Sequence, residues 1–329
     1  MNKEVKADYV EMKGILKNYI EKGQASAYID VKEEPSISVK PTPTNLFRLK
    51  KIETCGVHFF AVDCSTRTLK RANNWGIYIL RVAYATVRQR DVDWGFKERI
   101  RTIRGDAYVR RKILQETRLQ LESEMALDLI PKADENDYVL LDGASYFGGE
   151  RKFNVMLYEK CEKRGVKLLA ISKQSPTLRD EKGRDLIAAT YMLAREGCWV
   201  YYPVKKANIH EHLYGDISIV KLSEASPRAF RCDIMSYLTT QHDVPTLLSP
   251  LFIICEDPRC LGYPVVLWLA HDFSSVSETK LLQYHVQVEE VLATAGLLDV
   301  LRQEEMACNF ADELHGVKYA FKWERIEHA

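Results

Sequence analysis

The chain has 329 residues, of which 46% are hydrophobic and 28% charged, so it can bury a full core and has the composition of a globular protein. Its net charge of +1 gives by itself no reason to expect a polyanionic partner. No apolar run approaches the roughly 20 residues of a membrane-spanning helix, and the charged N-terminus lacks the apolar segment of a signal peptide. These features exclude an integral membrane protein and predict a cytoplasmic one.

The charges are unevenly distributed along the chain. Residues 41–120 hold 17 Lys and Arg against 7 Asp and Glu, whereas residues 233–329 hold 6 against 15. Such asymmetry is typical of a protein with one side facing nucleic acid, although two solvated faces that compensate each other are the alternative. The eight scattered cysteines form no Cys-x-x-Cys pair, which argues against a zinc finger or a disulfide framework.

The first 46 residues differ in pattern from the rest. Residues 1–23 predict a helix, because apolar side chains from Tyr9 to Ile20 fall near one stripe. Residues 24–46 are rich in Ser, Pro and Thr and predict a linker. We therefore divide the chain into an N-terminal helix with its linker (1–46) and one domain (47–329). The helix is interpreted as an appendage to the core and a candidate oligomerisation arm.

The core begins with two expected strands, 56–63 and 75–87, which should pair through a polar connection at 64–74. A helix over 107–130, ended by Pro131, follows. The remaining elements expected are strands at 138–143, 166–172, 199–204, 216–222, 252–255 and 265–269, and helices at 152–164, 183–195 and from Ser277 to about Arg302. Strands that alternate with helices, followed by further strands, predict an α/β core.

Two aspartates, Asp63 and Asp142, each end an expected apolar strand. A carboxylate there is costly to desolvate unless something compensates its charge. If the two strands are neighbours, both carboxylates point into one small space and favour a divalent cation such as Mg²⁺ or Mn²⁺, which prefers oxygen ligands. The alternative is that each aspartate caps the turn that follows it.

A third carboxylate comes from the helix over 107–130. At about 100° per residue, Glu122 lies near the middle of the apolar arc, with Arg118 one turn before it. A glutamate on a core face is unusual, and a buried ion pair with Arg118 is the alternative to a metal ligand. Carboxylates that hold divalent metal are the arrangement of nucleases, and the basic stretch around Asp63 could follow a DNA backbone.

Two further residues suit the same chemistry. Lys173 follows the strand over 166–172, where its ammonium could meet a scissile phosphate, although a solvated lysine at a strand exit fits equally. His271 follows the expected strand over 265–269. That position suits a metal ligand or a general acid or base, and a satisfied core histidine is the alternative.

Together these pieces resemble the NurA family, nucleases that partner the hexameric HerA ATPase in processing DNA ends. The resemblance runs from about residue 55 to 315 and consists of five pieces in the family's order: Ala61-Val62-Asp63-Cys64-Ser65, Arg118-Leu119-Gln120-Leu121-Glu122, Leu140-Leu141-Asp142-Gly143, Ile171-Ser172-Lys173, and Gly262-Tyr263-Pro264 through Ala270-His271. Cys64 replaces the family's usual glycine, and Ala144 stands where a serine is common. Neither departure removes a ligand.

The resemblance implies an RNase H-like fold, a mixed sheet flanked by helices, and a homodimer. It also implies Mn²⁺- or Mg²⁺-dependent hydrolysis of DNA, with exonuclease and single-strand endonuclease activity. Carried over residue by residue, Asp63, Glu122 and Asp142 would bind metal, His271 would be a ligand or proton carrier, and Tyr263 would line the site. The biological role can be DNA-end resection in repair or defence against phage DNA, and the sequence does not distinguish them. The alternatives are an adaptor subunit that docks on an ATPase ring without turnover, and another RNase H-like enzyme such as a resolvase.

Overall fold

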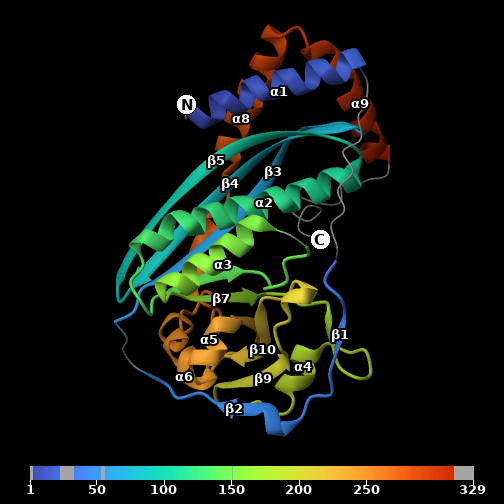
Figure 1. Ribbon diagram of the computed structural model, residues 1–329. Coiled ribbons are helices and arrows are strands. Elements are labelled where there is room, and N and C mark those ends of the chain that lie inside the picture. The colour runs from blue at the N-terminus through green and yellow to red at the C-terminus, as the bar shows by residue number, and fades with distance from the viewer. Residues whose placement is uncertain (1–2, 23–32, 53–55, 150, 315–329) are drawn as a thin grey trace.

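A mixed β-sheet of nine strands forms the centre of the molecule, and helices cover both of its faces (Figure 1). The computed structural model describes residues 3–22, 33–52, 56–149 and 151–314. Along the sheet the strands run in the order β2-β9-β10-β11-β7-β6-β3-β4-β5. The predicted α/β class, with a large mixed sheet flanked by helices and an N-terminal helix, is confirmed.

The sheet combines an antiparallel meander with a parallel centre. Strands β3, β4 and β5 are antiparallel neighbours, β6 and β7 run parallel to β3, and the remaining strands continue antiparallel beyond β7. The strands of this sheet are β2 (Leu46–Arg48), β3 (Phe59–Arg71), β4 (Trp75–Arg88), β5 (Asp91–Arg104), β6 (Tyr138–Asp142), β7 (Lys167–Ser172), β9 (Trp199–Lys205), β10 (Gly215–Lys221) and β11 (Phe230–Met235). A separate parallel pair joins β1 (Ile37–Ser38) to β8 (Leu178–Arg179).

Helices lie on the sheet and at both of its ends. In Figure 1, α2 and α3 cross the front of the sheet, α1 lies with α8 and α9 at the top, and α4, α5 and α6 surround the lower strands. The α-helices are α1 (Lys3–Lys22), α2 (Ala107–Leu129), α3 (Lys152–Arg164), α4 (Leu186–Tyr191), α5 (Ser236–Gln241), α6 (Val244–Leu248), α7 (Val265–Ser274), α8 (Glu278–Thr294) and α9 (Leu298–Leu314). Short 3₁₀ helices occupy Pro43–Asn45, Ile130–Lys132, Ile209–Glu211 and Ser249–Ile254. No helix in the described part of the chain is long and apolar enough to cross a membrane.

Strand β4 is buried on both faces. Along β4, Leu80 and Val82 pack into the cluster that includes α2, while Ile77 and Ile79 pack into a second cluster formed by α1 and α8. A strand covered on both sides needs apolar residues at successive positions, which is why its sequence reads as one continuous apolar run. This property made β4 predictable within a residue of its observed end.

The N-terminal helix is part of the packed structure. α1 lies against β5 and buries Val5, Met12 and Leu16. Its Asp8 accepts hydrogen bonds from the Arg99 guanidinium and from the Ile100 backbone N–H, at 2.8 Å each. The interpretation of this helix as an appendage is therefore wrong, because its apolar stripe closes the second core cluster. The boundary between residues 46 and 47 stays a proposal.

The predicted linker holds more structure than expected. Residues 23–32 lie outside the described residues, but β1 and the 3₁₀ turn at Pro43–Asn45 fall within the rest of it, and β2 starts at its last residue. β2 extends the sheet by pairing with β9. Strands of two or three residues are too short to show a periodicity, so they could not be predicted from the sequence.

One strand is longer than predicted and two were missed, because polar or charged side chains interrupt their apolar patterns. β3 continues through the expected polar connection to Arg71, and both β5 and β11 were not predicted. β5 is an edge strand whose charged side chains interrupt its apolar pattern, and β11 contains the buried pair Arg231 and Asp233. Charges that are compensated by distant residues cannot be recognised as strand positions from local sequence.

Three C-terminal predictions are wrong. The segment expected as a strand at 252–255 is the end of a 3₁₀ helix, and the one at 265–269 begins helix α7. A short apolar run does not by itself distinguish a strand from a buried helix. The expected single long helix is two, α8 and α9, separated at Gly296, whose φ of 69° ends the first helix.

Candidate active site

The candidate site lies where β6 ends beside the longer strand β3. The two strands pair in parallel as far as Val62 and Leu141, so the next residues, Asp63 and Asp142, occupy adjacent positions. The condition set by the sequence analysis, that the two strands be neighbours, is met. Asp63 is not at a strand end, because β3 continues to Arg71; it lies at the point where β3 loses β6 as a neighbour.

Asp63 is buried, and both of its carboxylate oxygens make hydrogen bonds. Its Oδ2 lies 2.6 Å from His271 Nδ1, and its Oδ1 accepts a hydrogen bond of 2.8 Å from the Cys64 backbone N–H. Burial alone would raise the pKa of Asp63, but the hydrogen bond and charge of His271, with a smaller contribution from Arg118, hold that pKa below its usual value. Asp63 is therefore ionised at neutral pH.

His271 reaches this position from a helix. It lies in the last turn of α7, which packs on β3 and β4, and half of its side chain is exposed. The prediction that it follows a strand is wrong, but the structure places its Nδ1 against Asp63. The interpretation as a core histidine does not fit a ring that is half exposed and bonded to a carboxylate.

Glu122 extends from α2 toward the same place. Its Oε1 lies 3.9 Å from Arg118 Nη2, and the same guanidinium nitrogen lies 3.9 Å from Asp63 Oδ1. Burial, opposed by Arg118 and reinforced by the negative charges of Asp63 and Asp142, raises the pKa of Glu122 to about 8. The three carboxylates are thus close enough to influence one another, and Arg118 lies between two of them.

Lys173 and Tyr263 border the third carboxylate. Lys173 Nζ lies 2.8 Å from Asp142 Oδ2 and 5.5 Å from the centre of the Tyr263 ring. Tyr263 is buried beside Asp142. Burial, the charges of Asp142 and Asp63 and the interaction of its hydroxyl with Asp142 raise the pKa of Tyr263. Lys173 is thus directed at a carboxylate, although part of its side chain reaches solvent.

Arg118 has more contacts in the site than the sequence predicted, which was an ion pair with Glu122 alone. The structure places its guanidinium against Asp63 as well, and the charge of Asp142 also influences its pKa. The spacing of four residues between Arg118 and Glu122 was the available signal, but it reveals contacts only within one helix. The link to Asp63, 55 positions earlier in the chain, depends on how α2 packs on the sheet.

The donor atoms suit a hard divalent cation, since the carboxylates supply oxygen and His271 supplies nitrogen. As the side chains stand, no three His, Cys, Asp or Glu residues in the described ranges are arranged to hold one ion. Arg118 and Lys173 compensate the carboxylates instead. Metal binding would therefore require Lys173 to release Asp142, and Glu122 to ionise.

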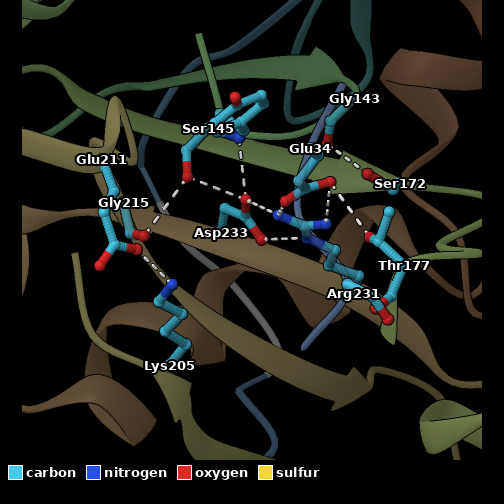
Figure 2. A network of polar contacts seen from close by, with 12 residues as sticks. Glu34, Gly143, Ser145, Ser172, Thr177, Lys205, Glu211, Gly215, Arg231 and Asp233 are labelled. Atoms are coloured by element: carbon cyan, nitrogen blue, oxygen red, sulfur yellow. Dashed lines mark hydrogen bonds and ion pairs between the residues drawn. The ribbon is translucent and has the colours of Figure 1, made fainter. Parts of the chain in front are cut away.

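A buried polar network holds the loop that follows Asp142. Asp233 Oδ2 accepts hydrogen bonds from the Ser145 backbone N–H and hydroxyl, at 2.8 and 2.9 Å. Arg231 in turn pairs with Asp233 and with Glu34, as Figure 2 shows. Since Ser145, Arg231 and Asp233 are almost completely buried, this network fixes the path of the chain just beyond Asp142.

Comparison with known proteins identifies the fold. The crystal structure of the NurA nuclease from Sulfolobus solfataricus is similar to this chain with a TM-score of 0.56 and 17% identity, over 89% of this chain and 98% of that one. The chain has the NurA fold. The resemblance predicted from the five motif pieces is confirmed at the level of fold, and the expected RNase H-like architecture is consistent with it.

Other NurA structures are less similar. A NurA structure with manganese matches with a TM-score of 0.47 and 11% identity, over 88% of this chain and 98% of that chain. A NurA structure bound to dAMP and manganese matches with a TM-score of 0.46 and 12% identity, over 83% and 92%. These lower scores add nothing to the fold assignment. No family model and no curated protein sequence matches the chain.

Proposed function

We propose that this protein is a divalent-metal-dependent nuclease that hydrolyses phosphodiester bonds in DNA. The observation that supports the proposal is that Asp63 and Asp142 follow paired residues of β3 and β6, while Arg118 lies 3.9 Å from both Asp63 and Glu122 and Lys173 lies 2.8 Å from Asp142. The NurA fold agrees with this activity. Asp63, Glu122, Asp142 and His271 are the residues that would hold Mn²⁺ or Mg²⁺. Such an ion, when bound, activates water and stabilises the leaving oxygen of a phosphodiester.

The cationic side chains would bind the substrate. Arg118 presents a planar guanidinium that suits phosphate oxygens, and Lys173 is exposed enough to exchange Asp142 for a phosphate. Both would neutralise charge on the phosphoryl group as the bond breaks. The ammonium that pairs with Asp142 in the free protein thus becomes a substrate contact when DNA enters.

His271 and Tyr263 would act at the edge of the reacting group. Because Asp63 binds Nδ1 of His271, the other ring nitrogen, Nε2, is the one available to coordinate or to transfer a proton. The Tyr263 hydroxyl, which is buried beside Asp142, can donate a hydrogen bond to a phosphate oxygen. Its raised pKa keeps it protonated, as a donor must be.

The test is cleavage of linear DNA with Mn²⁺ by the wild type and by Asp63→Asn, Glu122→Gln and Asp142→Asn. We expect each substitution to lower the rate by at least about 100-fold, since loss even of an outer-shell partner costs about 10–100-fold in activity. Glu124→Gln is the matched control, because Glu124 lies on the same helix with its side chain exposed. Full activity of Glu122→Gln or Asp142→Asn would refute the proposal.

The finer assignments rest on the resemblance and are also proposals. We propose exonuclease and single-strand endonuclease activity in DNA-end processing, a homodimer, a cytoplasmic location and a HerA-like hexameric ATPase as partner. Light scattering of the purified protein tests the dimer, and co-purification with an ATPase of that type tests the partner. A panel of linear, branched and RNA–DNA hybrid substrates separates this nuclease from a resolvase or an RNA hydrolase.

One observation favours the alternative of an adaptor subunit without turnover. Lys173 and Arg118 already compensate the carboxylates, and among the described side chains no three potential ligands are arranged around one ion. An adaptor would bind a partner but show the same absence of cleavage in the wild type and in Asp63→Asn. The cleavage assay therefore decides between the two.

A further inference from the structure

A cavity of about 690 Å³ adjoins the candidate active site. It is lined by the loop after β7, by α4 and by the loop before β11, and so lies at the edge of the sheet where β6 and β7 end. Two of its lining residues also contact the active site. Lys173 pairs with Asp142, and the Phe230 ring lies 5.3 Å from that of Tyr263. The cavity and the carboxylates therefore share a wall.

The cavity is cationic. Besides Lys173 it is lined by Arg179 and Arg228, and neither of these arginines makes an ion pair within the parts of the chain that the structure describes. Asp185 is the carboxylate in the lining, and its oxygen already accepts the Ala188 backbone N–H at 2.8 Å. Uncompensated guanidinium groups around a hollow favour an anionic ligand, phosphate above all.

The same cavity has an apolar side and one unpaired hydroxyl. Tyr191, Ile187 and Phe230 line it with aromatic and aliphatic surface. Ser175, which is 6% exposed, also lines it, and its hydroxyl has no hydrogen-bond partner among the described residues. A buried hydroxyl is costly to leave unpaired, so this group indicates a polar ligand atom at the same wall.

We propose that this cavity binds one nucleotide of the DNA strand next to the bond that is cut. The base would pack against Tyr191 and Phe230, the phosphates would meet Arg179 and Arg228, and Ser175 would bond the sugar or base. Aromatic surface beside cationic side chains is the combination that binds single-stranded nucleic acid, and the volume lies in the range typical of small-ligand sites. This inference rests on the proposed nuclease function, because it takes the ligand to be a unit of the substrate.

The test measures binding without cleavage. A fluorescently labelled single-stranded oligodeoxynucleotide is titrated with protein in EDTA, and fluorescence anisotropy gives the affinity at several salt concentrations. Arg179→Gln and Arg228→Gln should each weaken binding by roughly 5–20-fold and reduce the slope of log affinity against log salt by about 1, as loss of a phosphate contact does. Arg302→Gln is the control, since Arg302 lies on α9 in an exposed ion pair with Glu289.

A second variant tests the cavity without changing charge. Ala188 is exposed on α4 and lines the cavity, so Ala188→Trp should fill the space and weaken binding to a similar degree, with an unchanged salt slope. The inference is overturned if the wild type does not bind the oligonucleotide, or if all three cavity variants bind it as the control does. It is also overturned if RNA of the same sequence competes better than DNA.

The outcomes separate this inference from the nuclease proposal. If the variants weaken binding but the wild type fails to cleave DNA with Mn²⁺, the cavity binds a nucleotide of single-stranded DNA, but the nuclease assignment fails and no cleaved bond lies beside the cavity. If the wild type cleaves and the cavity variants bind as the control does, the nuclease assignment stands and the cavity assignment fails.

Discussion

Asp63 and Glu122 approach the same Arg118 guanidinium to the same distance, 3.9 Å, yet their pKa values move in opposite directions. The pKa of Asp63 is lowered because His271 bonds its Oδ2, while burial and two neighbouring carboxylates raise the pKa of Glu122 to about 8. Both side chains are carboxyl groups near the same arginine, so their surroundings, and not their residue type, set their protonation states. The hydrogen bond and charge of His271, with smaller contributions from Arg118 and Lys173, lower the pKa of Asp63, whereas burial is the largest cause of the raised pKa of Glu122.

At the same scale, the network around Arg231 predicts a large effect of a single substitution. Asp233→Asn removes one of the two carboxylate partners of Arg231, whose side chain is 1% exposed, and leaves its buried charge with Glu34 alone. We expect the free energy of unfolding to fall by about 3–5 kcal/mol, measured by urea denaturation. Asp257→Asn is the control: its ion pair with Arg259 is largely exposed and should cost less than about 1 kcal/mol. Equal losses in the two variants would contradict this account.

Asp216 predicts how stability depends on pH. Burial raises its pKa, but hydrogen bonds from the Ala207 backbone N–H, Tyr202 and Lys206 hold that pKa below the usual value. A carboxyl whose pKa is lower in the folded state stabilises the fold above its unfolded pKa of about 3.9 and loses this contribution as pH falls through the folded pKa. The stability advantage of the wild type over Asp216→Asn should be full at pH 6 and decline below about pH 4. A pH-independent difference in urea midpoints would show that Asp216 has no such role.

Among the elements, α1 and α7 show how packing changes the meaning of a sequence pattern. α1 has an ordinary apolar stripe, yet this stripe covers the outer face of the meander together with α8. α7 follows Pro264 and carries His271 and Ser274 toward β3, where Ser274 lies 3.4 Å from Asp63 Oδ2. The sequence of each helix predicts its apolar face, but contacts with the sheet determine where that face packs.

The packing of α1 can be tested with one substitution. Leu16 is completely buried in the second core cluster, so Leu16→Ala should lower the free energy of unfolding by about 2–5 kcal/mol through lost burial and a residual cavity. Val10→Ala, on the same helix at a position 66% exposed, should change it by less than about 0.5 kcal/mol. Chemical denaturation compares the two. If both are neutral, α1 does not pack on the sheet in solution.

Over the whole molecule, different groups of residues stabilise the core and form the candidate site. Three hydrophobic clusters hold the sheet and its helices, while Arg118 and Lys173 compensate the site's carboxylates. Folding should therefore not depend on metal. Chelation with EDTA should abolish DNA cleavage and leave the thermal midpoint within about 2 °C, because a change of 1 kcal/mol shifts Tm by roughly 2–4 °C in a chain of this size.

Readdition of Mn²⁺ should restore cleavage and raise the thermal midpoint by the same small amount, about 2 °C or less, since a ligand that binds only the folded state stabilises it by mass action. Cleavage that persists in EDTA, or a midpoint that drops by 10 °C or more without metal, would contradict this division between core and site. Asp142→Asn serves as the reference, because it should lose the Mn²⁺-dependent rise in Tm while keeping the same core.

What the sequence by itself determined is the central part of the fold and the identity of the candidate residues. β4, β6 and β7 are continuous apolar runs, and α2 and α3 have clear helical limits, so these elements follow from local pattern. The tertiary structure alone decided that α1 packs on the meander, that residues 265–269 are helical, and that β5 and β11 are strands. It also decided which charges compensate Asp63 and Asp142. These features depend on contacts between residues far apart in the chain, and burial or charge compensation by a distant neighbour leaves no periodic trace in the local sequence.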